Sequence, residues 1–412
     1  MSIIVAVPRE TFPGESRVAL TPAAVTALVK NKLAVVVESG AGAAAGYADA
    51  SYEAKGARIA DRGEVFATAD ILLQVRCTLS PQSPDFQLLK PSALLIGFCD
   101  PLGTPAAVAE ASKKGISLIS MELIPRITRA QAMDALSSQA NIAGYKAVVM
   151  AANASPKIFP MLMTAAGTLQ AARVFVVGVG VAGLQAISTA RRLGGVVSAF
   201  DVRPEVKEQV QSVGAKFVEL PLDTAGAADK GGYAKALSAD QQKKQAELMA
   251  KVVAESDVVI TTAAVPGRPA PKLIPASAVE RMQPGSVIVD LAAERGGNCE
   301  LTEPGKTVVK HGVTIIGHTN IPATVAQHSS AMYANNLAKL LALMVNKEGA
   351  LKIDQADEVI SGSLVCHGGK VVHPRVTEVL GAKAPAIGVG AVPAAAAVGA
   401  SRVEAVAIGG AR

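Results

Sequence analysis

The stretch RVFVVGVGVAGLQAISTARRLGGVVSAFD, residues 173–201, decides the fold of this 412-residue chain. A short β-branched run at 174–177 is typical of a buried parallel strand, and it leads into three glycines spaced G-x-G-x-x-G. An apolar helical pattern follows over 184–193, and a second strand at 196–200 ends on Asp201. Strand, glycines, helix, strand and acid in this order predict a dinucleotide-binding βαβ unit.

The three glycines of this turn, Gly178, Gly180 and Gly183, have different physical tasks. The first permits the tight turn, the second lets the backbone approach a pyrophosphate, and the third lets helix and strand pack closely. A pyrophosphate would lie at the N-terminus of the following helix, where unpaired N–H groups and the helix dipole favour anions. Because the chain holds 37 glycines, the glycine spacing alone would be weak evidence, and the prediction depends on the flanking elements.

Asp201 and Arg203 bear on which dinucleotide the site prefers. Asp201 would accept hydrogen bonds from the adenosine ribose hydroxyls and would repel a 2′-phosphate. Arg203, two residues later, could instead bind a 2′-phosphate. Because the carboxylate is present, the sequence favours NAD over NADP.

Composition limits the class of protein. Half of the residues are hydrophobic, but only 3% are aromatic and tryptophan is absent, so the interior is built from small aliphatic side chains. The net charge of +6 is spread along the chain without an aromatic-interleaved basic patch, so nothing indicates nucleic-acid binding. Mild positive charge is compatible with an anionic cofactor or a membrane-adjacent partner and demonstrates neither.

The cysteines and histidines show no metal-ligand spacing. Cys77, Cys99, Cys299 and Cys366 are far apart and form no C-x-x-C motif, which argues for a reducing compartment and against a zinc site. The N-terminal MSIIVAVPRE lacks the basic region and apolar length of a signal peptide. We therefore expect a cytoplasmic protein without a bound metal.

Strand and helix patterns alternate along the whole chain. Strands are expected at 3–7, 34–38, 71–76, 93–98, 117–121, 174–177, 196–200, 216–220, 257–262, 286–291 and 313–317. Helices are expected at 22–32, 127–150, 184–193, 204–213 and 323–345, and a closing hairpin at 359–372. This rhythm predicts an α/β protein of two Rossmann-like, doubly wound parallel-sheet domains separated by a cleft.

The domain boundaries follow from the two long helices, which are expected to bridge the domains. A discontinuous first Rossmann-like domain would take residues 1–135 and 325–383, and the NAD-binding domain would take residues 136–324. The first βα junction, PRETFPGESRVAL, lacks the glycine spacing, so the first sheet is not expected to hold a pyrophosphate. Residues 384–412 form an Ala/Gly-rich tail with two prolines, which predicts a flexible or partner-contacting segment rather than a membrane span.

A polar segment precedes the second domain. The sequence PRITRAQAMDALSSQAN, residues 125–141, gathers amides, hydroxyls and a carboxylate within an arc of about 120° if it is helical at about 100° per residue. The members of that arc are Gln131, Asp134, Ser137, Ser138 and Asn141, with Arg126 just before them. Such a surface can position a ligand but has no base near neutrality, and the alternative is a solvated helix face.

The stretch DTAGAADKGGYAKAL, residues 223–237, is long and rich in glycine and alanine. Loops of this length in compact domains are usually functional or disordered. Its single aromatic, Tyr233, would suit the tip of a lid over a bound nucleotide, and a merely flexible loop is the alternative.

Six motifs give the chain a family resemblance that extends over roughly residues 3 to 380. They are RVALTP at 17–22, MELIPRITRAQAMDALSSQANIAGY at 121–145, the glycine segment with Asp201–Arg203, GGYAK at 231–235, KKQAE at 243–247 and IVDLAAERGGNC at 288–299. The chain resembles the NAD(H)-binding subunits of proton-translocating NAD(P) transhydrogenase, within the alanine dehydrogenase and transhydrogenase family. The polar-segment motif is the most specific of these matches.

The resemblance implies a function and a set of site residues. Hydride would pass directly from NADH to NADP(H) bound on a partner subunit, coupled to proton movement through a membrane-spanning subunit, and the chain would be a homodimer attached peripherally to the cytoplasmic face of the inner membrane. Arg126, Gln131, Asp134 and Ser137 would seat the nicotinamide. By the same matching, NAD would contact Val181, Ala182, Gly183, Asp201, Val202, Arg203, Gly232, Tyr233, Gln245 and Ala264.

Two other functions remain open at this point. An NAD-dependent alanine dehydrogenase shares the fold and RVALTP, but its chemistry needs an acid or base near the substrate carbonyl. The family's lysine and histidine regions here read ILLQVRCTLS and LLIGFCDPLG, with Gln74, Arg76, Cys99 and Asp100 but neither lysine nor histidine. A nucleotide-sensing module would be expected to lack the polar segment or the loop tyrosine, and both are present.

Overall fold

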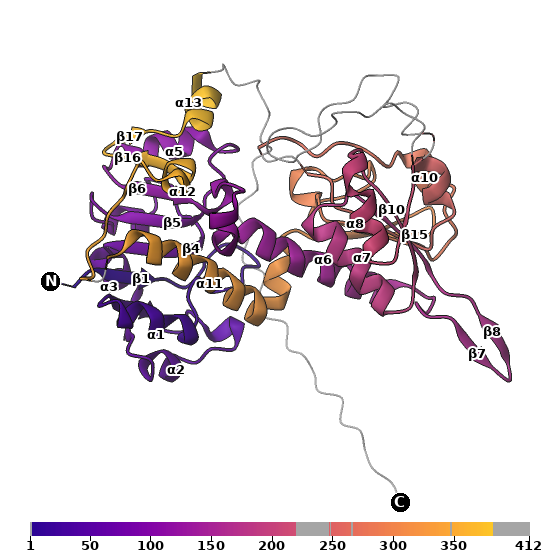
Figure 1. Ribbon diagram of the computed structural model, residues 1–412, viewed down its shortest axis with the longest axis horizontal. Coiled ribbons are helices and arrows are strands. Elements are labelled where there is room, and N and C mark those ends of the chain that lie inside the picture. Colours follow the sequence, from indigo (N-terminus) through magenta and orange to yellow (C-terminus); the bar gives the residue numbers. More distant parts are fainter. Residues whose placement is uncertain (1, 220–246, 248, 265–266, 347, 382–412) are drawn as a thin grey trace, which may run out of the picture.

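The computed structural model describes residues 2–219, 247, 249–264, 267–346 and 348–381. Two β-sheets, each covered by helices, lie at opposite ends of the molecule, and two long helices run between them (Figure 1). The predicted α/β class with two doubly wound parallel-sheet domains is confirmed.

The first sheet is built mostly from the first third of the chain. Its strands are β1 (Ile4–Val7), β2 (Ala34–Glu38), β3 (Arg58–Ala60), β4 (Ile71–Arg76), β5 (Leu94–Phe98), β6 (Ser117–Ser120), β16 (Leu364–His367) and β17 (Lys370–Val371). They lie in the order β17-β16-β6-β5-β4-β1-β2-β3, and only β16 and β17 pair antiparallel. Since those two strands come from the far end of the described chain, the first domain is discontinuous, as predicted.

The second sheet contains β9 (Arg173–Val177), β10 (Val196–Phe200), β11 (Lys216–Phe217), β12 (Val258–Thr261), β13 (Val287–Asp290), β14 (Thr307–Lys310) and β15 (Val313–Ile316). Its order is β11-β10-β9-β12-β13-β15-β14, with β14 antiparallel. The parallel strands of both sheets, each counted from its own first strand, follow the order 3-2-1-4-5-6. Strand order reverses beside β1 in one sheet and beside β9 in the other, and ligands of such folds bind at that point.

Helices cover both faces of each sheet. The first sheet packs against α1 (Pro22–Lys30) on one face and against α3 (Arg62–Thr68), α4 (Pro84–Leu88) and α5 (Pro105–Ser112) on the other. The second packs against α7 (Val181–Arg192) and α8 (Lys207–Ser212) on one face and α10 (Ala276–Val279) on the other. Shorter helices are α2 (Asp49–Glu53), α12 (Glu358–Ser363) and α13 (Pro374–Gly381).

The two bridging helices are α6 (Ala135–Ala154) and α11 (Ala326–Met344). Helix α6 contributes Ala135 to the core of the first sheet and Ala147 and Val148 to the core of the second. Helix α11 returns the chain and packs Leu337 and Leu340 under the first sheet. The division at 135/136 and 324/325 remains our prediction, and it falls at the starts of these two helices.

Several predicted elements differ from those observed. Residues 359–363 belong to helix α12, so the closing hairpin contains only β16 and β17. The predicted helix at 204–213 opens with a 3₁₀ turn at Pro204–Val206 before α8. Strands β3 and β14 and the hairpin of β7 (Leu162–Thr164) and β8 (Gly167–Leu169) were not predicted, because they lie at edges or in solvent and lack long apolar runs.

Candidate dinucleotide-binding site

The glycine turn between β9 and α7 has the geometry that the sequence predicts. Gly178 has φ +93°, and a Cβ there would lie 2.7 Å from the Oγ1 of Thr262. A Cβ on Gly183 would lie 1.9 Å from the carbonyl oxygen of Gly178, so only glycine lets the helix pack this close to the strand. A Cβ on Gly180 would meet nothing within 4 Å. Open space at Gly180, beside the N-terminus of α7, is what an approaching pyrophosphate requires.

The loop after β12 forms the other wall of the strand-order reversal. Asn298, which is fully buried, accepts from Ala263 N at 3.0 Å and donates to Ala263 O at 2.8 Å. These two bonds fix the backbone immediately before Ala264, which is exposed at the edge of the site. Asn298 belongs to the GGNC motif, and sequence reasoning assigned it no role although the motif was recognised.

Asp201 and Arg203 form one unit. The Asp201 carboxylate accepts from Val179 N at 2.7 Å and from the Arg203 backbone N at 2.9 Å, and it holds the Arg203 guanidinium through Nε and Nη2, each at 2.9 Å. The hydrogen bond to Asp201 raises the pKa of Arg203. Val202, between them, packs against the core on one face of the sheet. The guanidinium therefore faces the carboxylate, which lowers its attraction for a 2′-phosphate.

The polar segment is not the continuous helix that the sequence predicts. Residues Thr128–Met133 form a 3₁₀ turn, Asp134 caps the next helix, and α6 starts at Ala135. The Asp134 carboxylate accepts from Ser137 N at 2.9 Å and from Ser137 Oγ at 2.6 Å. The prediction missed this break because an Asp followed three residues later by Ser reads equally well as a helix interior or an N-cap.

The break redistributes the predicted polar stripe. Ser138 is buried and donates to Asn336 Oδ1 of α11 at 2.8 Å, so its placement on an exposed arc is wrong. Arg126 and Gln131 are exposed, on the loop before the 3₁₀ turn and on the turn itself. Within the described part of the chain, the Gln131 side chain makes no hydrogen bond, so its amide can bind a ligand.

Gly144 connects the polar segment to the glycine turn. A Cβ at Gly144 would lie 2.1 Å from the carbonyl oxygen of Ala182, so α6 crosses α7 in backbone contact next to the turn. Ser137 lies seven residues earlier on α6, about 10 Å along the helix at about 1.5 Å per residue. The structure thus brings Asp134 and Ser137 toward the N-terminus of α7. Gly232, Tyr233 and Gln245 lie outside the described residues.

The equivalent crevice of the first sheet is closed by an internal anion. Glu10, just after β1, accepts from the backbone N of Val75 at 2.6 Å and of Arg76 at 3.1 Å, at the end of β4. Burial raises the pKa of Glu10 to about 7, against the lowering effect of these two hydrogen bonds. A carboxylate already occupies this strand-order reversal, which explains physically why the first sheet suits no pyrophosphate.

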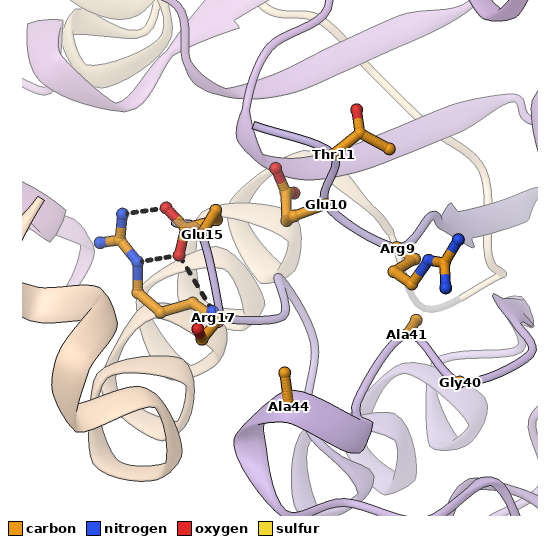
Figure 2. Close-up of a pocket in the computed structure, with 9 residues that line it drawn as sticks. Arg9, Glu10, Thr11, Glu15, Arg17, Gly40, Ala41 and Ala44 are labelled. Atoms are coloured by element: carbon orange, nitrogen blue, oxygen red, sulfur yellow. Dashed lines mark hydrogen bonds and ion pairs between the residues drawn. The ribbon is translucent and has the colours of Figure 1, made fainter. Parts of the chain in front are cut away.

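A cavity of about 390 Å³ lies beside Glu10, with the Glu15–Arg17 pair on one side and Arg9 on the other (Figure 2). Both arginines are paired, Arg9 with Glu38 at 3.9 Å and Arg17 with Glu15 at 2.6 Å. The Glu15–Arg17 pair is nearly inaccessible to solvent, and although burial opposes it, Arg17 lowers the pKa of Glu15. The charges of this cavity are therefore balanced internally, unlike the open space at Gly180.

Arg17, from the RVALTP motif, also joins the two domains. Its Nη1 donates to Gln139 Oε1 of α6 at 2.9 Å, and its Nη2 donates to Asn320 Oδ1, before α11, at 2.9 Å. Sequence reasoning recognised the motif but could not assign this role, because the partners lie 122 and 303 residues away.

The cysteine prediction needs a correction. Cys77 and Cys99 form a disulfide with a Cα–Cα distance of 4.8 Å, although 22 residues separate them. They follow the neighbouring parallel strands β4 and β5, and strand pairing brings sequence-distant ends together. Cys299 and Cys366 are buried free thiols. Among the residues that the structure describes, no group of three or more His, Cys, Asp or Glu side chains could hold a metal ion.

Known proteins match almost the whole chain. The family models for the N-terminal and C-terminal domains of alanine dehydrogenase/PNT match residues 6–143 and 147–374. An NAD(P) transhydrogenase alpha subunit of Rhodospirillum rubrum is 47% identical over 378 residues, covering 90% of this chain and 98% of that protein. The alanine dehydrogenase of Bacillus subtilis is 28% identical over 389 residues, covering 92% and 95%.

A solved structure agrees with these relatives. The transhydrogenase from Sinorhizobium meliloti superposes with a TM-score of 0.80 at 46% identity, covering 90% of this chain and all of that one. Both family models and the high identity over nearly the full relative place the resemblance beyond a shared fold. The chain therefore belongs to the alanine dehydrogenase/PNT family, on the branch of the NAD(P) transhydrogenase alpha subunits.

Proposed function

We propose that this chain is the NAD(H)-binding subunit of a proton-translocating NAD(P) transhydrogenase. NADH bound here supplies a hydride that passes directly to NADP⁺ on a partner subunit, giving NAD⁺ and NADPH, while a membrane-spanning subunit moves protons. The observation that carries the proposal is the joint presence of an open glycine turn and, on the helix that crosses it, a polar segment without an acid–base group.

The residues present fit a dinucleotide. The space at Gly180 accepts a pyrophosphate, and the first-turn amides of α7, from Val181 to Gly183, face it as unpaired donors of a helix N-terminus. Asp201 at the end of β10 would bind the adenosine ribose, exchanging part of its contact with Arg203 for the hydroxyls. Arg126, Gln131, Asp134 and Ser137 would orient the nicotinamide.

Positioning is sufficient for this reaction, because hydride transfer between two nicotinamides needs no proton transfer to either ring. The contribution of the chain is then proximity and orientation, which can account for many orders of magnitude in rate. Asp134 has a double task in this reading. It caps α6 through Ser137, and the same bond holds the Ser137 hydroxyl in one orientation.

The alternative, alanine dehydrogenase, is disfavoured by what surrounds the family's acid–base positions. Gln74 exchanges hydrogen bonds with Thr78, and Cys99 is in the disulfide. Arg76 pairs with Glu294 at 2.8 Å, and Asp100 pairs with Arg295 at 2.6 Å. Each of these side chains is engaged in a structural contact, which does not suit proton transfer to a substrate.

A homodimer is supported by the β7–β8 hairpin, which extends away from the second domain (Figure 1). Its apolar side chains are exposed, with Met163 at 72%, Met161 at 58% and Leu169 at 52% of full exposure. A two-stranded hairpin is marginally stable alone, and an exposed apolar patch indicates a covering partner. Light scattering of Met163→Glu beside the unsubstituted chain tests this, with a monomer expected for the variant.

Attachment to the cytoplasmic face of the inner membrane would come through the partner subunits. In the part of the chain that the structure describes, no helix has the length and apolarity to span a bilayer. NADP(H) would bind on the second partner, and no nucleic acid or metal is part of the proposal.

The decisive experiment uses Gln131→Asn, which shortens an exposed side chain that has no internal hydrogen bond among the described residues. We expect NADH affinity to stay within about twofold, because charged contacts to pyrophosphate and ribose dominate binding. Single-turnover hydride transfer in a mixture with the NADP-binding subunit should fall about a hundredfold if the donor carbon shifts by about 1 Å. A normal rate, or a loss explained wholly by weaker NADH binding, would contradict the proposal.

A further inference from the structure

Two ion pairs cross between the domains at neighbouring points. Arg76, the last residue of β4, donates from Nη2 to Glu294 at 2.8 Å. Arg295 donates from Nη2 to Asp100, two residues past β5, at 2.6 Å. Glu294 and Arg295 are consecutive in the 3₁₀ turn Ala293–Arg295 that follows β13. Adjacent strand ends of one sheet thus meet adjacent residues of the other domain, with opposite polarity in the two pairs.

Each strand end is held by a partly buried glutamate. Glu10 accepts from the backbone N of Val75 and of Arg76, as described above. Glu122 accepts from the backbone N of Asp100 at 2.7 Å and from the hydroxyl of Ser120. Two carboxylates from different elements therefore fix the backbones from which the two crossing side chains project.

The backbone at Asp100 is itself specialised. Its φ is +44°, in the left-handed region that Asp and Asn tolerate better than other non-glycine residues. The carbonyl of Asp100 accepts from Gly103 N and Thr104 N, which closes the loop after β5. The disulfide joins Cys99, next to Asp100, to Cys77, next to Arg76. The two strand ends form one rigid ledge facing the second domain.

This ledge also reaches the candidate cofactor site. Leu102, on the loop after β5, packs against Gly267, where an added Cβ would lie 2.8 Å from the Leu102 Cβ. Gly267 follows Ala264 by three residues. Glu294 also accepts from Asn320 N at 3.1 Å, next to the hydrogen bond between Asn320 and Arg17. The crossing contacts thus connect both to the cofactor loop and to the chain segment entering α11.

We propose that Arg76–Glu294 and Asp100–Arg295 form an interdomain latch that fixes the angle between the domains, with Glu10 and Glu122 as its positioning residues. The latch sets the distance between the polar segment, carried by the first domain, and the glycine turn, carried by the second. It rests on the proposed function for its consequence in hydride transfer, but its effect on domain geometry and on NADH binding can be measured without any hydride acceptor.

The expected effect is modest, because both pairs are partly exposed to solvent, Asp100 and Arg295 by 40% and 39% of their side-chain area. Exposed ion pairs shift an equilibrium by about fivefold at most, and salt screens them. Loss of one pair should therefore weaken NADH binding by about two- to fivefold at low salt. The difference should shrink at high ionic strength.

The test uses Asp100→Asn, Arg295→Gln and the double variant. Asparagine tolerates the left-handed backbone, so the loop after β5 should stay folded. Nitroxide labels at Lys55→Cys and Gln209→Cys, both exposed and in different domains, report the interdomain distance when labelling is done without reductant. NADH affinity is read from the fluorescence of NADH itself, since the chain has no tryptophan. The matched control is Glu110→Gln, which breaks the exposed Lys113–Glu110 pair at 2.6 Å at the end of α5, within the first domain.

We expect a narrow distance distribution in the unsubstituted chain and a broader one in each single variant. The double variant should be no broader than either single variant, because the two residues act through each other. Glu110→Gln should match the unsubstituted chain. Unchanged distributions in the single variants, or effects that add in the double variant, would overturn the latch. If the unsubstituted chain bound no NADH at all, the proposed function would fail instead, which keeps the two failures distinct.

The positioning role of Glu122 is tested by a pair of substitutions. Glu122→Gln keeps an acceptor oxygen for Asp100 N, whereas Glu122→Ala removes it. Glu122→Ala should broaden the distance distribution as Asp100→Asn does, and Glu122→Gln should restore most of the narrow distribution. A narrow distribution in a folded Glu122→Ala variant would remove Glu122 from the latch.

Discussion

Gly180→Ala separates cofactor binding from folding at the glycine turn. An added Cβ would meet no protein atom within 4 Å. The backbone at Gly180 has φ −84° and ψ −164°, an extended conformation that alanine adopts without strain. The substitution should therefore change the free energy of unfolding by less than about 1 kcal/mol, the range of glycine and alanine differences at helix starts.

The same methyl group would stand where a pyrophosphate must approach α7. Charged hydrogen bonds contribute about 1.5–3 kcal/mol each, so displacing the pyrophosphate from one such bond weakens NADH binding by roughly 10- to 150-fold at about 1.4 kcal/mol per factor of ten. Gly183→Ala should behave differently. Its Cβ would lie 1.9 Å from the Gly178 carbonyl oxygen, and overpacking of this kind destabilises the fold by about 1–3 kcal/mol or more.

The assay is NADH titration by fluorescence, together with urea unfolding, for Gly180→Ala, Gly183→Ala and a control. Gly63→Ala in α3 is the control, because its Cβ would make only an ordinary contact at 3.4 Å with Asp61 and helical Gly→Ala is neutral or stabilising. Unchanged NADH affinity in Gly180→Ala would refute the reasoning, since the pyrophosphate would then lie elsewhere. A large loss of stability in Gly180→Ala would refute the geometry itself.

Four further predictions follow from the site and its surroundings. Burial raises the pKa of Glu10 from 4.5 to about 7, so the folded chain holds a proton there that the unfolded chain has released. Stability from this group is therefore lost as pH rises through that window, by up to about 3 kcal/mol; urea unfolding of Glu10→Gln should lack this part of the pH dependence, and parallel curves would count against it. The Asp201 carboxylate should make NADH bind more tightly than NADPH, as two fluorescence titrations would check, and equal affinities would contradict it. The isolated chain should not reduce NAD⁺ with alanine at alkaline pH, and an appreciable rate in that spectrophotometric assay would restore the alanine dehydrogenase reading. Thiol titration of the urea-denatured chain should find two of the four cysteines reactive before reduction and all four after it; four at the outset would exclude the Cys77–Cys99 disulfide.

Local pattern was enough to predict the second domain and its turn. The run 173–201 combines a β-branched strand, three glycines and an amphipathic helix within a contiguous stretch, so every interaction that defines the turn is local. Gly178 and Gly183 are needed because of atoms a few residues away, apart from Thr262. The alternation of strands and helices was likewise sufficient for the fold class, because parallel strands require crossover helices.

Only the tertiary structure decided which polar residues face a ligand and which face the protein. The sequence treats Ser137 and Ser138 alike, but the break at Asp134 directs Ser137 to the cap and Ser138 to α11. Glu10 and Arg76 lie 66 residues apart in sequence, and Asp100 and Arg295 lie 195 apart. Their pairing depends on strand order and on how the two domains meet. Those are global properties of the fold, and no local periodicity or motif spacing encodes them.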